Sequence, residues 1–337
     1  MKYIVCKEPG KFLMEEKEAP SRKSGEALLK ITKVGICGTD LHAFQGNQSF
    51  FTYPRILGHE LAAEILEIDT NEQNLKVGDH VIIMPYLSCG NCVACRNGKT
   101  NCCTDIAVLG VHTDGGMQEI VSLPTNILIP AGTLSDKEIA IVEPLAIGAH
   151  SLRRADIKKG ESVLVIGCGP IGFGIIKLAQ VAGANVIAMD VNDQRLNFAK
   201  EAFGVEHLVN AIDNPLENLL ARNNNELPTV VIDATGNKKA LESGVNYMAH
   251  GGKYVLVGHH KGDLTFNHPF IHSRETTLMC SRNATIEDML KVKEVLESGV
   301  FPTDAYVTHE VSFEEMIENF DSWLKPETGV VKAMLSL

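Results

Sequence analysis

The sequence predicts an α/β protein that combines a β-rich region with a doubly wound parallel sheet. Residues 1–145 contain short apolar runs separated by Gly, Pro and Asn, which is typical of a barrel or a sandwich. From about residue 146, strand-like runs alternate with helix-like runs, which indicates a parallel sheet covered by helices. A glycine-rich turn at 167–172 joins the first of these strands to the first helix.

The chain has 337 residues, and at roughly 100–200 residues per domain this length predicts two domains. One is expected to comprise residues 1–145 and 283–337, because the segment 329–337 reads as a strand that fits the β-rich region. The other is expected to comprise residues 146–282, with the nucleotide-binding pattern.

The apolar patterns predict individual elements in chain order. In the β-rich region the expected strands are 27–34, 61–68 and 81–84. In the second domain the expected strands are 162–166, 185–189, 229–232 and 253–257, and the expected helices are 170–182, 193–203 and 238–248. Two further helices are expected at 286–298 and 313–325.

Composition and charge exclude several classes of function. The formal net charge of -11 disfavours nucleic-acid binding, which depends on Lys and Arg. No apolar stretch reaches the ~18–20 residues that a membrane span needs, and the N-terminal apolar run is too short for a secretory signal. We therefore expect a cytoplasmic protein whose partner is a small molecule.

The turn Gly167-Cys168-Gly169-Pro170-Ile171-Gly172 has the G-x-G-x-x-G pattern between a strand and a helix. Gly167 would permit the tight turn, Gly169 the approach of a pyrophosphate, and Gly172 the close packing of helix on strand. Asp190 ends the next strand about 20 residues later, where a carboxylate binds a ribose 2′-hydroxyl and repels a 2′-phosphate. The pattern thus favours NAD over NADP; the alternative is a glycine turn without a ligand and a surface Asp.

Cys89, Cys92, Cys95 and Cys103 have spacings that can close a tetrahedral zinc site on one loop. Iron–sulfur ferredoxins share the first three spacings, but their fourth Cys follows after three residues and precedes Pro. Here the last gap is seven residues and no Pro follows, so zinc is favoured. Spacing alone leaves Cys102 open as the fourth ligand. A site with four protein ligands would order the loop rather than catalyse.

A second metal site is indicated by Cys37, His59 and Glu60, with Glu143 farther along the chain. A thiolate, an imidazole and a carboxylate form a plausible open zinc shell, and against one thiolate and one carboxylate the dication leaves the site near neutral. The pair His59-Glu60 lacks the second His of the H-E-x-x-H proteases. Each residue taken singly is more often structural than a ligand.

The segments GICGTDLH, LGHE, EPLA and GCGPIG, together with the four-cysteine loop, resemble the zinc-containing medium-chain dehydrogenase/reductase family, and the resemblance covers essentially the whole chain. It implies a GroES-like catalytic domain built from both chain ends and an inserted Rossmann domain that binds NAD. It also implies the roles of single residues. The implied catalytic zinc ligands are Cys37, His59 and Glu60, with Glu143 as a further ligand or close neighbour.

The same resemblance implies that Thr39 takes the proton of the substrate and that His42 passes it to solvent. It implies that Cys103, rather than Cys102, completes the structural zinc site, which makes two zincs per chain. It places Asp190 and Arg195 at the adenine ribose. It further implies a homodimer or a homotetramer.

Within the family, the segments GNQSFFTYPRILGHE, GVHTDGG and ETTLMCSRNAT resemble polyol and sugar-acid dehydrogenases, such as the bacterial L-galactonate and L-gulonate 5-dehydrogenases. We expect a zinc- and NAD-dependent oxidoreductase that acts on a secondary alcohol of such a substrate. The candidate substrate contacts are Asn47, Phe51, His112 and Arg282. Arg282 is the candidate cation for a sugar-acid carboxylate, with a surface or helix-capping role as the alternative.

Three alternative functions stay open at this point. An L-threonine 3-dehydrogenase would share GICGTD and the Glu-Pro motif, but the run Ala43–Asn47 after His42 counts against an amino-acid substrate. A neutral polyol dehydrogenase of the sorbitol type would share the zinc ligands. A non-catalytic NAD-binding sensor could lose Cys37, His59 or Thr39 and still fold, and their presence favours an enzyme.

Overall fold

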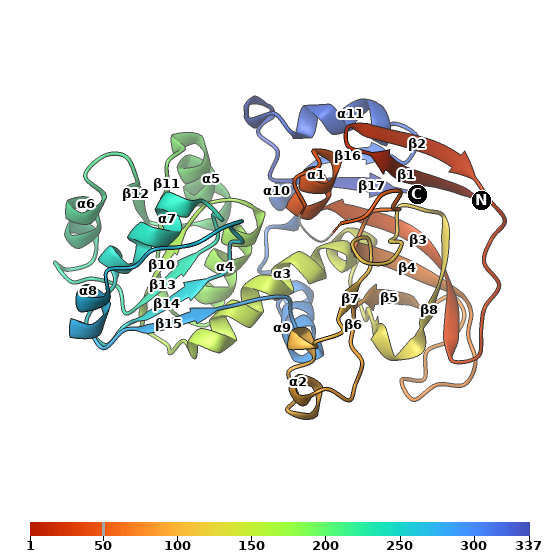
Figure 1. Ribbon diagram of the computed structural model, residues 1–337, viewed down its shortest axis with the longest axis horizontal. Coiled ribbons are helices and arrows are strands. Elements are labelled where there is room, and N and C mark those ends of the chain that lie inside the picture. Colours follow the sequence, from red (N-terminus) through yellow and green to blue (C-terminus); the bar gives the residue numbers. More distant parts are fainter. Residues whose placement is uncertain (49–50) are drawn as a thin grey trace. The chain divides into compact units, whose positions relative to one another are not determined.

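The computed structural model describes residues 1–48 and 51–337, which divide into two compact units (Figure 1). The first unit comprises Met1–Pro144, Thr285–Gly299 and Thr303–Leu337, and the second comprises Leu145–Ala284 and Val300–Pro302. Both chain ends therefore belong to one unit, because the C-terminal strand β17 (Lys332–Ser336) pairs with the early strand β3 (Glu26–Ile36).

The first unit is built on a mixed sheet of seven strands. Its order is β16-β17-β3-β4-β5-β9, with β8 paired to β3. The remaining bounds are β16 Val307–Ser312, β4 Glu60–Glu67, β5 His80–Ile83, β8 Ile120–Pro124 and β9 Leu128–Pro130. Alternate residues of β3, namely Ala27, Leu29 and Ile31, are buried, as expected for a strand with one face on a core. Two short pairs accompany the sheet, β1 (Lys2–Glu8) with β2 (Lys11–Glu16) and β6 (Tyr86–Leu87) with β7 (Ala107–Val108).

Most helices and turns of the first unit are a few residues long, and α9 and α11 are the longer ones. The helices are α1 Gly38–Phe44, α2 Val93–Arg96, α9 Ile286–Glu297, α10 Thr303–Tyr306 and α11 Met316–Trp323, with 3-10 turns η1 Thr100–Cys102, η2 Thr125–Ile127 and η4 Pro326–Thr328. The ring of Phe44 stacks on Phe12 of β2 at 4.8 Å, and Phe320 of α11 contacts both rings. This aromatic cluster anchors α1, which begins directly after Cys37.

The second unit is a six-stranded parallel sheet with the order β12-β11-β10-β13-β14-β15. The strands are β10 Ser162–Ile166, β11 Asn185–Asp190, β12 His207–Asn210, β13 Val230–Asp233, β14 Lys253–Leu256 and β15 Thr277–Cys280. The chain first moves outward from β10 to β12 and then continues from β13 to β15 on the other side of β10. In such sheets, ligands bind at the carboxyl ends of the strands where the order reverses, here between β10 and β13.

Helices follow most of these strands. They are α4 Pro170–Val181, α5 Asp193–Phe203, α6 Pro215–Arg222, α7 Lys238–Ser243 and α8 His268–Ser273, with the 3-10 turn η3 Gly244–Tyr247. One core cluster joins Leu164 and Ile166 of β10 to Leu219 of α6 and Leu241 of α7. Because side chains alternate along a strand, the buried Val163 and Val165 face the opposite side of the sheet.

Several elements differ from those expected. The predicted helix 238–248 is two elements, α7 and η3, and helix 313–325 is confined to α11. The 20-residue helix α3 (Asp136–Ala155) has no counterpart among the predictions, and it contains Pro144, which removes one backbone donor from its interior. Strands β12 and β15, at the two edges of the sheet, were also not predicted.

Candidate metal centres and nucleotide site

Cys37, His59 and Glu60 lie together, with candidate ligand atoms that are all within 4.8 Å of one another. Strand pairing explains how residues far apart in sequence meet here. Gly35 of β3 is the partner of Glu60, the first residue of β4, so that Cys37 and His59 flank the same end of the two strands. His59 and Glu60 are buried, and Cys37 is half-buried.

The chemistry of this cluster fits a zinc ion. Thiolate, imidazole and carboxylate are all zinc ligands. In the described part of the chain, Nδ1 of His59 is buried without a hydrogen-bond partner. Burial by itself would lower the pKa of His59, but the neighbouring Cys37, Asp40 and Glu143 act in the opposite direction and together raise the pKa well above its usual value. The pocket is thus negative enough to favour a cation.

Asp40 binds the backbone beside two members of the cluster, and the sequence analysis did not single it out. Its fully buried carboxylate accepts hydrogen bonds from the backbone N–H of Cys37 at 2.9 Å and of Gly58 at 3.3 Å. Its Oδ1 also lies 4.0 Å from Nδ1 of His59. Burial raises the pKa of the Asp40 carboxyl. Asp40 ties together the two loops that carry Cys37 and His59, and its place in the capping box of α1 was the available signal.

Lys332 is the second residue that sequence reasoning missed. Its buried Nζ lies 2.6 Å from each carboxylate oxygen of Glu60 and donates to the carbonyl of Ile36 at 3.1 Å. Burial by itself would lower the pKa of Lys332, but the Glu60 carboxylate reverses this and the pKa is raised. A single Lys in a C-terminal strand gives no local sign of such a contact.

Glu143 is buried in α3 but does not belong to the group of ligand atoms within 4.8 Å. It accepts a hydrogen bond from the hydroxyl of Tyr86, which is also buried. Burial raises the pKa of Glu143, although His59 acts in the opposite direction. Burial and the Glu143 carboxylate raise the pKa of Tyr86 well above its usual value. Tyr86 was not among the sequence candidates.

Thr39 and His42 both lie on α1, three residues apart, and therefore share one side of the helix. Thr39 is half-buried and His42 is exposed. The helix thus carries one half-buried hydroxyl two residues after Cys37 and one imidazole in contact with solvent.

The candidate substrate residues are distributed over both units. In the first unit, Asn47 is exposed, and Phe51 packs edge-on against Tyr53 with ring centroids 4.8 Å apart. The exposed His112 accepts a hydrogen bond from the backbone N–H of Val108 at 3.1 Å. Arg282 is exposed and belongs to the second unit, where it follows β15.

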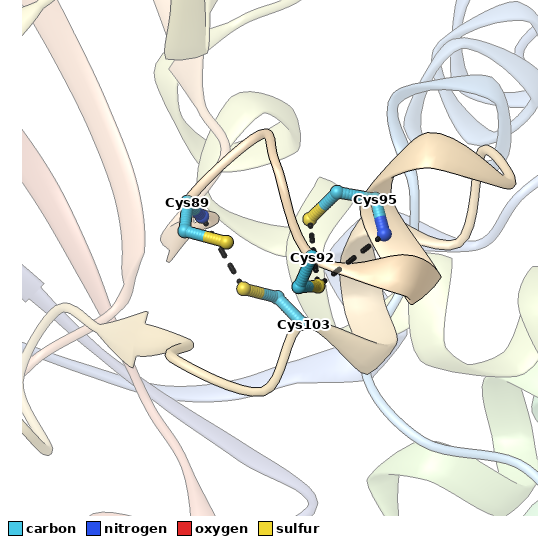
Figure 2. Close-up of side chains that lie close together, drawn as sticks. All are labelled: Cys89, Cys92, Cys95 and Cys103. Atoms are coloured by element: carbon cyan, nitrogen blue, oxygen red, sulfur yellow. Dashed lines mark hydrogen bonds between the residues drawn. The ribbon is translucent and has the colours of Figure 1, made fainter.

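The four cysteines of the loop form a second cluster, in which the sulfurs of Cys89, Cys92, Cys95 and Cys103 lie within 4.8 Å of one another. Figure 2 shows the side chains converging from α2 and from the loop segments on either side. The N–H of Cys89 donates to the sulfur of Cys103 at 3.2 Å, and Cys92 caps α2 by accepting from the N–H of Cys95. Cys102 is exposed and lies outside the group.

The electrostatics of this loop suit a metal ion. Backbone N–H groups of Cys95 and Thr104 stabilise the Cys92 thiolate and lower its pKa to about 5. Burial and the neighbouring thiols raise the pKa of Cys95 to about 11. Four thiolates in one cluster repel one another, and a zinc ion removes that repulsion, so that metal binding and loop folding are coupled.

The glycine turn has the geometry of a phosphate-binding loop. Gly167 has φ of +98°, and a Cβ on Gly172 would lie 1.8 Å from the carbonyl oxygen of Gly167. Gly169 caps α4, where a Cβ would meet nothing within 4 Å, and the half-buried Pro170 and Ile171 open the helix. The backbone at Gly169 is therefore accessible at a helix N-terminus, which favours an anion.

Asp190 lies at the carboxyl end of β11 beside this turn. Its oxygens accept hydrogen bonds from the N–H of Cys168 at 2.7 Å and of Asn192 at 2.9 Å, and the side chain is buried. Arg195 is exposed in the first turn of α5, where its N–H is capped by Asn192 at 3.3 Å. Asp190 thus fixes the shape of the glycine turn and places a negative charge next to it.

Known protein families match both units of the chain. Residues 23–133 match the alcohol dehydrogenase GroES-like domain, and residues 170–298 match the zinc-binding dehydrogenase domain. L-galactonate-5-dehydrogenase of Escherichia coli strain K12 is 40% identical over 345 residues, which cover 100% of this chain and 99% of the relative. The chain belongs to the zinc-type alcohol dehydrogenase family.

Other members of the zinc-type alcohol dehydrogenase family extend the comparison. Sorbitol dehydrogenase of Bacillus subtilis strain 168 is 31% identical over 346 residues, covering 99% of this chain and 97% of the relative. An alcohol dehydrogenase structure from E. coli CFT073, complexed with NADH, superposes with a TM-score of 0.93 at 30% identity and covers 100% and 99% of the two chains. A zinc-binding dehydrogenase of Sinorhizobium meliloti 1021, bound to NADP, gives a TM-score of 0.91 at 25% identity and covers 100% and 99%.

The expectations of a GroES-like domain with a Rossmann domain, and of a dehydrogenase, are confirmed by these matches. As a zinc-type alcohol dehydrogenase, the chain is an oxidoreductase that depends on zinc and a nicotinamide dinucleotide. None of the helices in residues 1–48 and 51–337 is long and apolar enough to cross a membrane.

Proposed function

We propose that this dehydrogenase oxidises a secondary alcohol of a polyol or sugar acid, such as L-galactonate or L-gulonate, with NAD as the hydride acceptor. The cluster of the half-buried Cys37 with the buried His59 and Glu60 is the observation that carries the proposal, because it offers an open zinc shell in a chain that also has an NAD-type glycine turn. The 40% identity to L-galactonate-5-dehydrogenase supports the sugar-acid class.

Two zinc sites per chain are part of the proposal. Cys37, His59 and Glu60 would hold the catalytic zinc, with Glu143 as a neighbouring carboxylate, and Cys89, Cys92, Cys95 and Cys103 would hold the structural zinc. When bound, zinc acidifies a substrate hydroxyl and the nicotinamide accepts a hydride. The four-cysteine site offers no open position and would only order its loop.

The protein's own contribution to the reaction is proton transfer and orientation. Thr39 Oγ1 would accept the hydroxyl proton of the substrate, since Thr39 is half-buried two residues after Cys37. His42, exposed on the same side of α1, would release the proton to solvent. The burial of His59, Glu60 and Glu143 keeps competing water away from the ligand cluster.

Preference for NAD over NADP would come from Asp190. Its carboxylate has accepting capacity beyond the two backbone N–H groups that it binds, so it can accept from a ribose 2′-hydroxyl. A 2′-phosphate at this position would meet a buried negative charge. Gly167, Gly169, Pro170, Ile171 and Gly172 would surround the pyrophosphate, and Arg195 would lie near the adenine ribose.

Substrate recognition is proposed for Asn47, Phe51 and His112 in the first unit and for Arg282 in the second. Arg282 would bind the carboxylate of a sugar acid. Replacing Arg282 by Ala should then reduce kcat/KM for sugar acids more than for neutral polyols, and equal losses would remove Arg282 from the proposal. A homodimer or homotetramer is proposed as the assembly, to be measured by light scattering.

The decisive experiment is a substrate panel with NAD and with NADP. We expect the highest kcat/KM with a six-carbon sugar acid such as L-galactonate or L-gulonate. A sorbitol-type polyol with the highest value would favour the neutral polyol dehydrogenase, and threonine with the highest value would favour the threonine dehydrogenase. NADH binding without turnover of any of these substrates would favour a sensor.

A further inference from the structure

The four-cysteine loop is closed at its base by two short strands, and one of them contacts a buried carboxylate of the candidate catalytic site. β6 and β7 pair antiparallel on the two sides of the loop, with Tyr86 opposite Val108. Cys89 follows Tyr86 by three residues, and Cys103 precedes Val108 by five. The Tyr86 side chain is buried, and its hydroxyl donates a hydrogen bond to Glu143. β6 therefore connects the four-cysteine loop to Glu143.

The cysteines nearest this base hold its two sides together. The N–H of Cys89 donates to the sulfur of Cys103 at 3.2 Å, and all four sulfurs lie within 4.8 Å of one another. β6 and β7 have two residues each, and a two-stranded hairpin is at best marginally stable by itself in water. A zinc ion bound by four thiolates would cross-link the two sides of the loop next to the base. The position of Tyr86 would then depend on whether the four-cysteine site is filled.

The chain before Tyr86 is anchored to the main sheet of the first unit. The N–H of Met84, directly after β5, donates to the carbonyl of Ile127 at 2.9 Å. The anchor holds the chain up to Met84, two residues before Tyr86. Loss of order in the four-cysteine loop would therefore displace β6 locally rather than unfold the first unit.

Glu143 depends on the Tyr86 hydroxyl for its place beside the catalytic cluster. Glu143 is 4% exposed, and an ionised carboxylate at such a position needs a donor or a cation. His59 and Glu60 of the cluster both interact electrostatically with Glu143. If the hydroxyl moves away, the carboxylate can regain a partner by turning toward a cation in the cluster.

We propose that Tyr86 is a positioning residue that couples the four-cysteine site to the catalytic cluster. Zinc in the four-cysteine site holds the Tyr86 hydroxyl on Glu143, and loss of that zinc frees the carboxylate to approach the catalytic cation. This role goes beyond the ordering of the loop. The inference rests on the two zinc sites of the proposed function.

The test uses cobalt(II) as a probe in the catalytic cluster, with zinc kept in the four-cysteine site. The visible absorption of cobalt reports the geometry of its ligands and does not depend on turnover. Y86F removes the hydroxyl and keeps the ring. We expect Y86F to shift the cobalt spectrum, because Glu143 becomes an additional ligand. The dissociation constant of the catalytic metal should fall about tenfold, in the range by which outer partners alter metal affinity.

The variant that tests the coupling is C103S, which should empty the four-cysteine site and leave one metal per chain by elemental analysis. Its cobalt spectrum should shift in the same direction as that of Y86F, and the double variant C103S/Y86F should show no further shift. C103H supplies an imidazole as the fourth ligand and should keep the loop zinc and the wild-type spectrum. If C103S does not fold, C95S removes a ligand from α2 instead and takes its place.

Two controls separate this coupling from general damage to the protein. C102S removes an exposed thiol outside the four-cysteine cluster, and it should keep both the zinc content and the spectrum. Y254F removes a buried hydroxyl of the second unit that donates to the carbonyl of Leu241 at 2.8 Å. It should leave the cobalt spectrum unchanged.

An unchanged spectrum in Y86F or C103S, or weaker binding of the catalytic metal in Y86F, would overturn the role of Tyr86. Shifts that add in the double variant would also overturn it, because the loop and the hydroxyl would then act independently. A wild-type protein with fewer than two zincs per chain would instead contradict the proposed zinc sites, and elemental analysis detects this before any variant is made.

Discussion

Asp190 serves the fold and the candidate nucleotide site with the same carboxylate. It binds the N–H of Cys168 inside the glycine turn and the N–H of Asn192 at the start of α5. The sequence pattern identified the residue through its position at the end of the second strand of the nucleotide-binding unit, and the structure adds that its side chain is buried next to the turn. A buried charge discriminates strongly between a hydroxyl and a phosphate.

Replacing Asp190 by Asn should therefore reduce the ratio of kcat/KM with NAD to kcat/KM with NADP. We expect a change of roughly tenfold or more, since a hydrogen bond to a charged group contributes about 1.5–3 kcal/mol. D193N is the control, because Asp193 is an exposed acid of α5 that contacts Asn210. A ratio that stays the same in D190N, or that falls equally in D193N, would speak against selection by Asp190.

Asp233 is a buried carboxylate whose ionised form lowers the stability of the fold. Its Oδ1 accepts from the N–H and hydroxyl of Thr235, while in the described part of the chain Oδ2 is buried without a partner. Burial raises the pKa of the Asp233 carboxyl above its usual value, with the contacts to Thr235 acting in the opposite direction. Because the folded pKa is the higher one, folding is penalised as pH rises above the unfolded value.

Asp233→Asn should remove this penalty. We expect the free energy of unfolding at neutral pH to rise by about 1 kcal/mol, because Asn removes the buried charge while its Oδ1 can still accept from Thr235. The difference from the wild type should shrink as pH falls toward the unfolded pKa, where both forms are neutral. Chemical denaturation at several pH values measures this, and a variant that is equally or less stable at neutral pH would contradict it.

At the scale of elements, the turn from β10 to α4 contains two glycines whose surroundings differ. Gly172 is needed for packing, since its Cβ would collide with the Gly167 carbonyl. Gly169 has open space where its Cβ would be, so the fold itself would accept a side chain there, and the proposed nucleotide site would need the glycine for the approach of a pyrophosphate.

Two single substitutions distinguish these roles. G172A should lower the free energy of unfolding by about 1–3 kcal/mol, as overpacking does, and should weaken NADH binding as a consequence. G169A should keep the melting temperature of the wild type but weaken NADH binding, because its methyl group would meet the pyrophosphate. Thermal melting and NADH fluorescence titration measure both. Normal NADH affinity in G169A would place the pyrophosphate elsewhere.

The metal content is a property of the whole molecule that the two candidate metal clusters predict. The protein should contain two zincs per chain. C103S should contain one, because Cys103 belongs to the four-sulfur group, whereas C102S should still contain two, because Cys102 is exposed and outside that group. Elemental analysis of the purified variants measures this, and loss of a zinc in C102S but not in C103S would reverse the assignment.

The architecture of the whole molecule was predicted where the signal is local. The alternation of strands and helices from β10 to β14 indicated the parallel sheet, because a buried strand needs a continuous apolar run. Helix α3 was not predicted, since Pro144 and Gly148 interrupt its helical pattern. Its packing in the fold, rather than its propensity, determines that it is helical.

The sequence by itself determined the glycine turn, the acid that follows it and the spacing of the cysteine loop, because each lies within a short stretch of chain whose geometry is set locally. Only the tertiary structure decided which partners surround the candidate catalytic ligands. Lys332 meets Glu60 across 272 residues, and Tyr86 meets Glu143 across 57. Such contacts arise from strand pairing and helix packing, and no local pattern in the chain encodes which buried charge finds which partner.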